Sequence, residues 1–143
     1  MKKAFAALLT LVVAATGLAV AGELIHSRTV PAAVTVADQV EEGLKRAGER
    51  VRPALPKRVD DATTLTDVSS AGTVLTYHYI VDMDKYELLP NFMQVTRGEA
   101  ISLICNTEDM KAAMEAGAIY EFNYRDGKLQ SLGGFVVASA DCR

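Results

Sequence analysis

The composition describes one small globular domain: the chain has 143 residues, of which 50% are hydrophobic and 23% charged, and a formal net charge of −3. A chain of this size has enough residues for one hydrophobic core but not for two full domains. Removal of residues 1–21, which contain Lys2 and Lys3, would change the charge from −3 to −5. This acidic balance argues against a nucleic-acid-binding protein, which needs a basic surface.

Residues 1–21 have the pattern of a signal peptide. Two lysines precede an uncharged, apolar run over residues 4–22, and this order is typical of export signals. Ala19-Val20-Ala21 is a small-x-small sequence that a signal peptidase can cleave before Gly22. The run also approaches the roughly 20 residues that cross a bilayer. The alternative is therefore an uncleaved inner-membrane anchor with the domain outside the cytoplasm.

Residues 22–54 are expected to form a tether followed by an amphipathic helix. Apolar residues recur there every three or four positions, with charged residues on the other faces, and Pro53 ends the helix. The apolar stripe consists of Val36, Val40, Leu44, Ala47 and Val51. It either packs on the sheet of its own domain or serves as a stalk or partner-binding helix. In the second interpretation, the partner-binding residues are Val36, Val40, Leu44 and Val51.

Residues 55–143 are expected to fold as an α+β domain that starts with two strands. The first is expected near residues 64–70. The second, over residues 73–82, alternates clearly: the core face carries Leu75, Tyr77, Tyr79 and Val81. His78 falls on the opposite face, toward solvent.

Helices and a hairpin complete this domain. Apolar spacing from Phe92 predicts a helix that ends near Cys105, and Asn106 is expected to cap the next helix. Asp126-Gly127 predicts a two-residue type I′ turn between strands over residues 118–125 and 128–137. The predicted fold is therefore an antiparallel sheet of about four strands, with helices packed mainly on one face.

Cys105 and Cys142 are the only cysteines in the chain. An even number of cysteines in an exported protein favours a disulfide. Two thiolates without a nearby histidine lack the four ligands of a structural zinc site. We therefore predict a Cys105–Cys142 disulfide that ties the second helical region to the end of the chain.

His78 is the main candidate for chemistry. With Asp82 and Asp84 it spells H-x3-D-x-D, but strand geometry separates His78 from Asp82 by about 13 Å, too far for one metal ion. A serine hydrolase is disfavoured because the chain has no G-x-S-x-G motif, although Ser69, Ser70, Asp60 and Asp61 are available as triad partners. No catalytic, cofactor-binding or metal-binding residue is therefore assigned.

Several short motifs share their order with a known group of proteins. They are Leu55-Pro56, Val59-Asp60, Tyr77-x-Tyr79, Cys105, Gly117, Tyr124-x-Asp126-Gly127 and Asp141-Cys142. The pattern resembles small exported or singly anchored bacterial envelope proteins, and this resemblance implies an envelope module without a particular activity. A fainter similarity is to pilotins of type II secretion systems, which also have a signal sequence, one cysteine after a helix and one near the end. Many pilotins carry a lipidated N-terminal cysteine, which this chain lacks.

Two hypotheses follow from the sequence. The first is a non-enzymatic, periplasmic or secreted protein that binds another envelope protein and assists assembly of a larger complex. It needs no cofactor and no nucleic acid, and it contacts the membrane only if the N-terminal segment is uncleaved. The alternative is a small periplasmic hydrolase or metal-binding protein that uses His78. An apolar groove beside the first helix would favour the first hypothesis, whereas a cleft with His78 and two carboxylates would favour the second.

Overall fold

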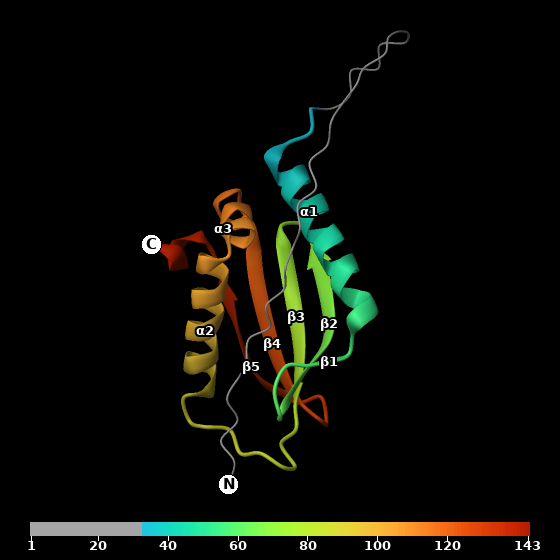
Figure 1. Ribbon diagram of the computed structural model, residues 1–143, viewed down its shortest axis with the longest axis vertical. Helices are drawn as coiled ribbons and strands as arrows, with labels where there is room; N and C mark the ends of the chain where they lie inside the picture. Colours follow the sequence, from blue (N-terminus) through green and yellow to red (C-terminus); the bar gives the residue numbers. More distant parts are fainter. Residues whose placement is uncertain (1–32) are drawn as a thin grey trace.

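The computed structural model describes residues 33–143, which form three helices and a five-stranded sheet (Figure 1). The strands are β1 (Lys57–Arg58), β2 (Thr63–Ala71), β3 (Val74–Val81), β4 (Ile119–Asp126) and β5 (Ser131–Val137). The helices are α1 (Val36–Val51), α2 (Phe92–Asn106) and α3 (Glu108–Glu115), with short 3-10 turns η1 (Arg52–Ala54) and η2 (Ser139–Cys142). The predicted signal segment, residues 1–21, lies outside the described residues. Within the described part of the chain, no helix is long and apolar enough to span a membrane.

The sheet has the strand order β1-β2-β3-β4-β5 and is mostly antiparallel. The prediction of a wholly antiparallel sheet is wrong at one pair, because β3 and β4 run parallel. The connection between them contains α2 and α3, which carry the chain back to the end of the sheet where β3 began. The strand that the sequence did not predict is β1, whose two residues are too few for an alternating pattern.

Helix α1 begins at a complete capping box. The Asp38 amide donates to Thr35 Oγ1 at 3.1 Å, and the Thr35 amide donates to Asp38 Oδ2 at 2.8 Å. These bonds satisfy backbone groups that the first turn would otherwise leave unpaired. The helix then packs on β2 and β3 at Gly48, where a Cβ atom would lie 3.7 Å from Leu75 Cδ1. A Cβ atom at this position would therefore be in ordinary van der Waals contact with the sheet.

A row of aromatic side chains crosses the face of the sheet on which α1 packs. Tyr77 on β3 stacks on Phe122 of β4 with ring centroids 5.1 Å apart, and Phe122 stacks on Phe135 of β5 at 4.9 Å. Phe92 of α2 meets the ring of Tyr124 edge-on at 5.4 Å. Because Tyr124 shares this face with the row, α2 covers the side of the sheet that α1 covers, as Figure 1 shows.

Two local predictions are wrong. Asn106 does not cap α3: it is the last residue of α2, and its side-chain amide donates to the Ser102 carbonyl at 2.7 Å. Only Thr107 separates the two helices, so Asn106 lies within α2 rather than before α3. The β4–β5 loop is also longer than a two-residue turn, because residues 127–130 separate the two strands. The Asp126 carboxylate holds this loop by accepting the amides of Lys128 and Gln130, both at 2.8 Å.

Candidate functional site

An open apolar groove lies between α1 and α3, above β3 and β4. Its volume is about 330 Å³. The lining residues are Val36, Gln39, Val40, Gly43, Leu44, Ala47 and Val51 from α1, Leu75 and Tyr77 from β3, Asp109, Met110, Ala113 and Ala116 from α3 and its C-terminal end, and Tyr120 from β4. Figure 1 shows the two helices on either side of these central strands.

Small residues keep this groove open. Gly43 lies on the groove side of α1, and a Cβ atom there would meet nothing within 4 Å. On the opposite wall, Ala113 and Ala116 present only methyl groups. Larger side chains at these positions would fill the space that the sheet leaves between the helices. The groove is therefore a consequence of residue size as well as of topology.

The floor of the groove is formed by uncharged tyrosine rings. Burial, and to a smaller extent the nearby Asp109 carboxylate, raises the pKa of Tyr120 to about 12. Burial also raises the pKa of Tyr77 well above its ordinary value, with a smaller contribution from Tyr120. Both hydroxyls stay protonated at neutral pH. Among residues 33–143, Asp109 is the one formally charged side chain in the lining of this groove.

The backbone beneath the groove has no free edge. β3 is hydrogen-bonded to β2 on one side and to β4 on the other, and β4 is hydrogen-bonded to β3 and β5. Interior strands have no row of unpaired amides and carbonyls with which an added strand can pair. A chain that enters the groove must therefore satisfy its own backbone hydrogen bonds.

The four residues that the sequence marked for partner binding all line the groove: Val36, Val40, Leu44 and Val51. Val40, Leu44 and Val51 are buried, whereas Val36 is 60% exposed at the start of α1. Sequence reasoning missed the opposite wall on α3. The three-residue spacing of Met110, Ala113 and Ala116 was the available signal, but α3 has only eight residues, too few for a convincing apolar stripe.

The alternative site at His78 lies on the other face of the sheet. His78 Nε2 lies 3.0 Å from Ser69 Oγ, and the two side chains come from paired strands. Nearby, Thr76 donates to Glu121 across β3 and β4 at 2.9 Å. No carboxylate hydrogen-bonds to the His78 ring among residues 33–143, and no group of three potential metal ligands occurs in that range. These contacts are typical of cross-strand polar pairs.

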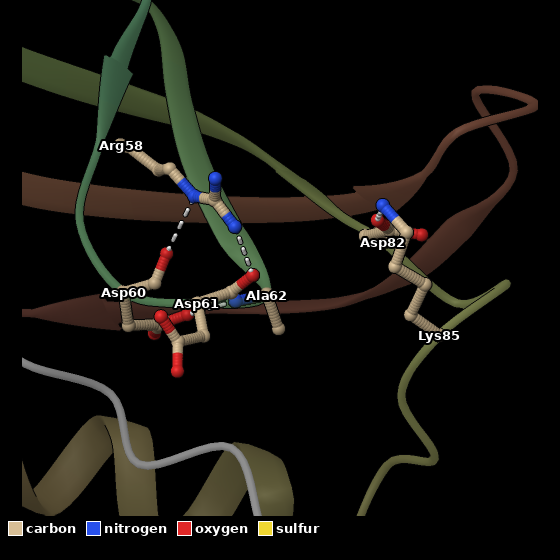
Figure 2. Close-up of polar contacts among 6 residues, drawn as sticks. All are labelled: Arg58, Asp60, Asp61, Ala62, Asp82 and Lys85. Atoms are coloured by element: carbon tan, nitrogen blue, oxygen red, sulfur yellow. Dashed lines mark hydrogen bonds and ion pairs between the residues drawn. The ribbon is translucent and has the colours of Figure 1, made fainter. Parts of the chain in front are cut away.

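Asp60 and Asp82, two of the aspartates that the sequence offered to His78, have local partners instead, as Figure 2 shows. Asp60 Oδ1 accepts the amides of Ala62 and Thr63, both at 2.7 Å, in the turn before β2. Arg58 braces the same turn by donating to the carbonyl of Asp61 at 2.6 Å. Asp82 pairs with Lys85 at 3.0 Å. These contacts account for Asp60 and Asp82 as structural residues of turns.

Cys105 and Cys142 are joined by a disulfide, with their Cα atoms 5.4 Å apart. The bond connects the end of α2 to η2, the last turn of the chain. It lies outside the groove lining. The disulfide therefore braces the fold rather than taking part in the candidate site.

No protein-family model matches this sequence, and no curated protein is similar enough to count as a relative. Solved structures are more informative. The pilotin EpsS of the Vibrio vulnificus type II secretion system is similar over 76% of this chain and 96% of its own, with 18% identity and a TM-score of 0.67. The fold is similar to that of a pilotin.

Two further structures share this pilotin-like fold. The type II secretion pilotin AspS from Vibrio cholerae is 15% identical and covers 75% of this chain and 95% of its own, with a TM-score of 0.62. A candidate secreted protein from Pseudomonas aeruginosa is also 15% identical and covers 78% of this chain and 100% of its own, with a TM-score of 0.67. At these identities, the likeness is one of fold.

Proposed function

We propose that this protein is a non-enzymatic envelope module that holds a helix of another envelope protein in the groove between α1 and α3 and thereby assists assembly of a larger complex. The observation that carries the proposal is the open, mainly apolar groove, in which the described residues contribute a single carboxylate. Exposed apolar concavities are typical of binding sites. The pilotin-like fold supports a partner in an assembly such as the type II secretion system, to which EpsS and AspS belong.

The backbone geometry favours a helical occupant. β3 and β4 have no free edge, so a segment in the groove gains no hydrogen bonds from the sheet. A helix satisfies its backbone groups internally and can present an aliphatic stripe to both walls. Helix α1, which forms one wall, is 16 residues or about 24 Å long, and α3, which forms the other, is 8 residues or about 12 Å long, so both walls together can hold about two turns of such a helix.

The proposed location is the periplasm or the exterior of the cell. The export signal predicted for residues 1–21 and the pilotin-like fold both support it. We propose that the mature protein begins at Gly22 and is released by osmotic shock. Mass spectrometry of the purified protein tests this proposal. An intact Met1 in the membrane fraction would contradict it and would favour the anchored alternative.

Site-specific photo-crosslinking in cells tests the binding site. A benzophenone amino acid replaces either Val36, which is 60% exposed in the groove lining, or Val136, which is 46% exposed on β5 and outside the groove lining. We expect a discrete protein adduct from position 36 and none from position 136. Equal adducts from both positions would contradict a specific groove.

Two glycines provide a matched pair of blocking variants. Gly43 in α1 lines the groove and Gly98 in α2 does not, and a Cβ atom at either position would meet nothing within 4 Å. Leucine at either site also favours the helix over glycine by roughly 0.5–1 kcal/mol. Gly43→Leu is therefore expected to abolish the adduct at position 36, whereas Gly98→Leu preserves it. An adduct that survives Gly43→Leu would refute the proposed function.

A further inference from the structure

We propose that Asp109 selects the occupant of the groove by charge, and that the partner helix carries one lysine or arginine beside its aliphatic stripe. This inference rests on the proposed function, because it concerns the chemistry of the same groove. It adds a residue that determines specificity to a site whose other lining residues are uncharged.

The position of Asp109 makes its carboxylate available to a partner. It lies in the first turn of α3, on the exposed rim of the groove. Among residues 33–143, its side chain forms neither a hydrogen bond nor an ion pair. The first turn of a helix favours a negative charge, so this carboxylate stabilises α3 as well. That structural role also applies to Glu108, which is not part of the groove lining.

The charge of Asp109 affects the pKa of Tyr120 in the floor of the groove. Asp109 and Tyr120 both line the groove, and the carboxylate contributes, after burial, to the raised pKa of Tyr120. The other lining side chains are aliphatic, aromatic or, in Gln39, a neutral amide. When an occupant displaces water from this groove, no cation among the lining residues of the described chain, 33–143, compensates Asp109. A basic residue on the occupant provides that compensation, whereas an acidic one adds repulsion.

The α1 wall of the groove, opposite Asp109, determines which side chains the partner helix must present besides its cation. Val40 and Leu44 of α1 contribute aliphatic side chains to that wall, and an aliphatic stripe on the partner is complementary to them. The occupant therefore combines leucine-like residues at helical spacing with one cation at the edge of that stripe, facing α3. Charge complementarity of this kind contributes more to the choice of partner than to affinity itself.

Synthetic helices test this inference directly. The probes are three 18-residue amphipathic peptides that share one leucine stripe and differ at a single flanking position, which holds Lys, Gln or Glu. Fluorescence anisotropy measures their Kd for the mature protein. We expect the Lys peptide to bind about tenfold more tightly than the Glu peptide, with the Gln peptide between them. Asp109→Asn should remove most of this difference, and Asp109→Lys should reverse the order.

Glu108→Gln is the matched control, because it removes the same charge from the same helical turn outside the groove lining. It should leave the order of the three peptides unchanged, and thermal unfolding verifies that all variants are folded. Binding that Gly43→Leu abolishes but that shows no Asp109-dependent preference would overturn this inference alone. Binding that Gly43→Leu leaves intact, or no binding of any peptide, would count against the groove and therefore against the proposed function itself.

Discussion

Arg97 and Asp141 connect α2 to the last turn of the chain, with Arg97 Nη2 2.6 Å from Asp141 Oδ1. The second carboxylate oxygen of Asp141 accepts the Ala138 amide at 3.0 Å, so one side chain both caps η2 and holds it against α2. The Cys105–Cys142 disulfide joins the same two elements, and on η2 it is attached one residue after Asp141. The C-terminal turn therefore has a covalent and an electrostatic connection to the same helix.

Asp141→Asn should reduce the free energy of unfolding at pH 7 by about 1.5–3 kcal/mol, the usual range for a hydrogen bond to a charged group. The Ala138 amide and then Arg97 lower the pKa of Asp141 in the folded state, so its stabilisation is present above the ordinary value of 3.8 and is lost as the pH falls through the folded pKa. Urea unfolding of both proteins from pH 7 to pH 2 should therefore show a difference that shrinks with acid. A difference that grows with acid would contradict this account. Arg97→Gln, which spares the cap, should cost less because Arg97 is 42% exposed.

Loss of the disulfide should cost more than loss of the ion pair. The two cysteines are 37 residues apart in sequence, and closing a loop of that size stabilises the folded state by roughly 4 kcal/mol in the chain-entropy model. Cys105→Ser, Cys142→Ser and the double variant should lose similar stability, because each removes the same bond. Urea unfolding measures the loss. Two thiols alkylated per chain in the unreduced, denatured protein would show that the bond does not form.

Substitutions at Gly48 should separate close helix packing from helix propensity. A Cβ atom at this position would lie 3.7 Å from Leu75 Cδ1 and 3.8 Å from Val68, which is ordinary contact. Gly48→Ala should therefore be neutral or stabilise the protein by up to about 1 kcal/mol. Gly48→Leu should destabilise it by about 1–3 kcal/mol, because the longer side chain pushes α1 away from β2 and β3. Thermal unfolding distinguishes these outcomes, and Gly98→Leu, which meets no neighbour, serves as the control.

Glu99 should make the protein less stable as the pH rises. Its Oε2 atom is buried without a hydrogen-bond partner among residues 33–143, and burial followed by repulsion from Asp60 raises its pKa. A raised folded-state pKa means that the stabilising, protonated form is complete below the unfolded pKa and is lost as the pH rises through the folded pKa. Glu99→Gln should therefore increase stability at pH 7 and lose that advantage near pH 4. Equal pH profiles for Glu99→Gln and for Glu87→Gln, an exposed loop control, would rule out this effect.

His78→Ala should have little effect on folding or on the crosslink at position 36. The ring loses one hydrogen bond to Ser69 on the polar face of the sheet, and such a loss costs about 1 kcal/mol or less. Ser69→Ala is the matched variant, because it removes the same contact from the other strand. A large loss of function at normal protein level in His78→Ala, with Ser69→Ala unaffected, would instead support chemistry at His78.

The sequence alone determined the features that depend on local spacing. The alternation of Leu75, Tyr77 and Tyr79 predicted β3 and its core face, and the apolar stripe from Val36 to Val51 predicted α1. A count of two cysteines in an exported chain was enough to predict their pairing. Each of these patterns is contained in a short segment or in composition, so it can be recognised before the chain folds.

Only the tertiary structure decided the direction of β4 and the existence of the groove. The parallel β3–β4 pair depends on how α2 and α3 return across the sheet. That same path places Met110 and Ala113 opposite Leu44, more than 60 residues earlier in the chain. No local pattern encodes the distance between two helices, because it depends on which side chains pack beneath both of them. The stripe on α1 was therefore visible in the sequence, whereas the second wall and the charge of Asp109 beside it required the folded domain.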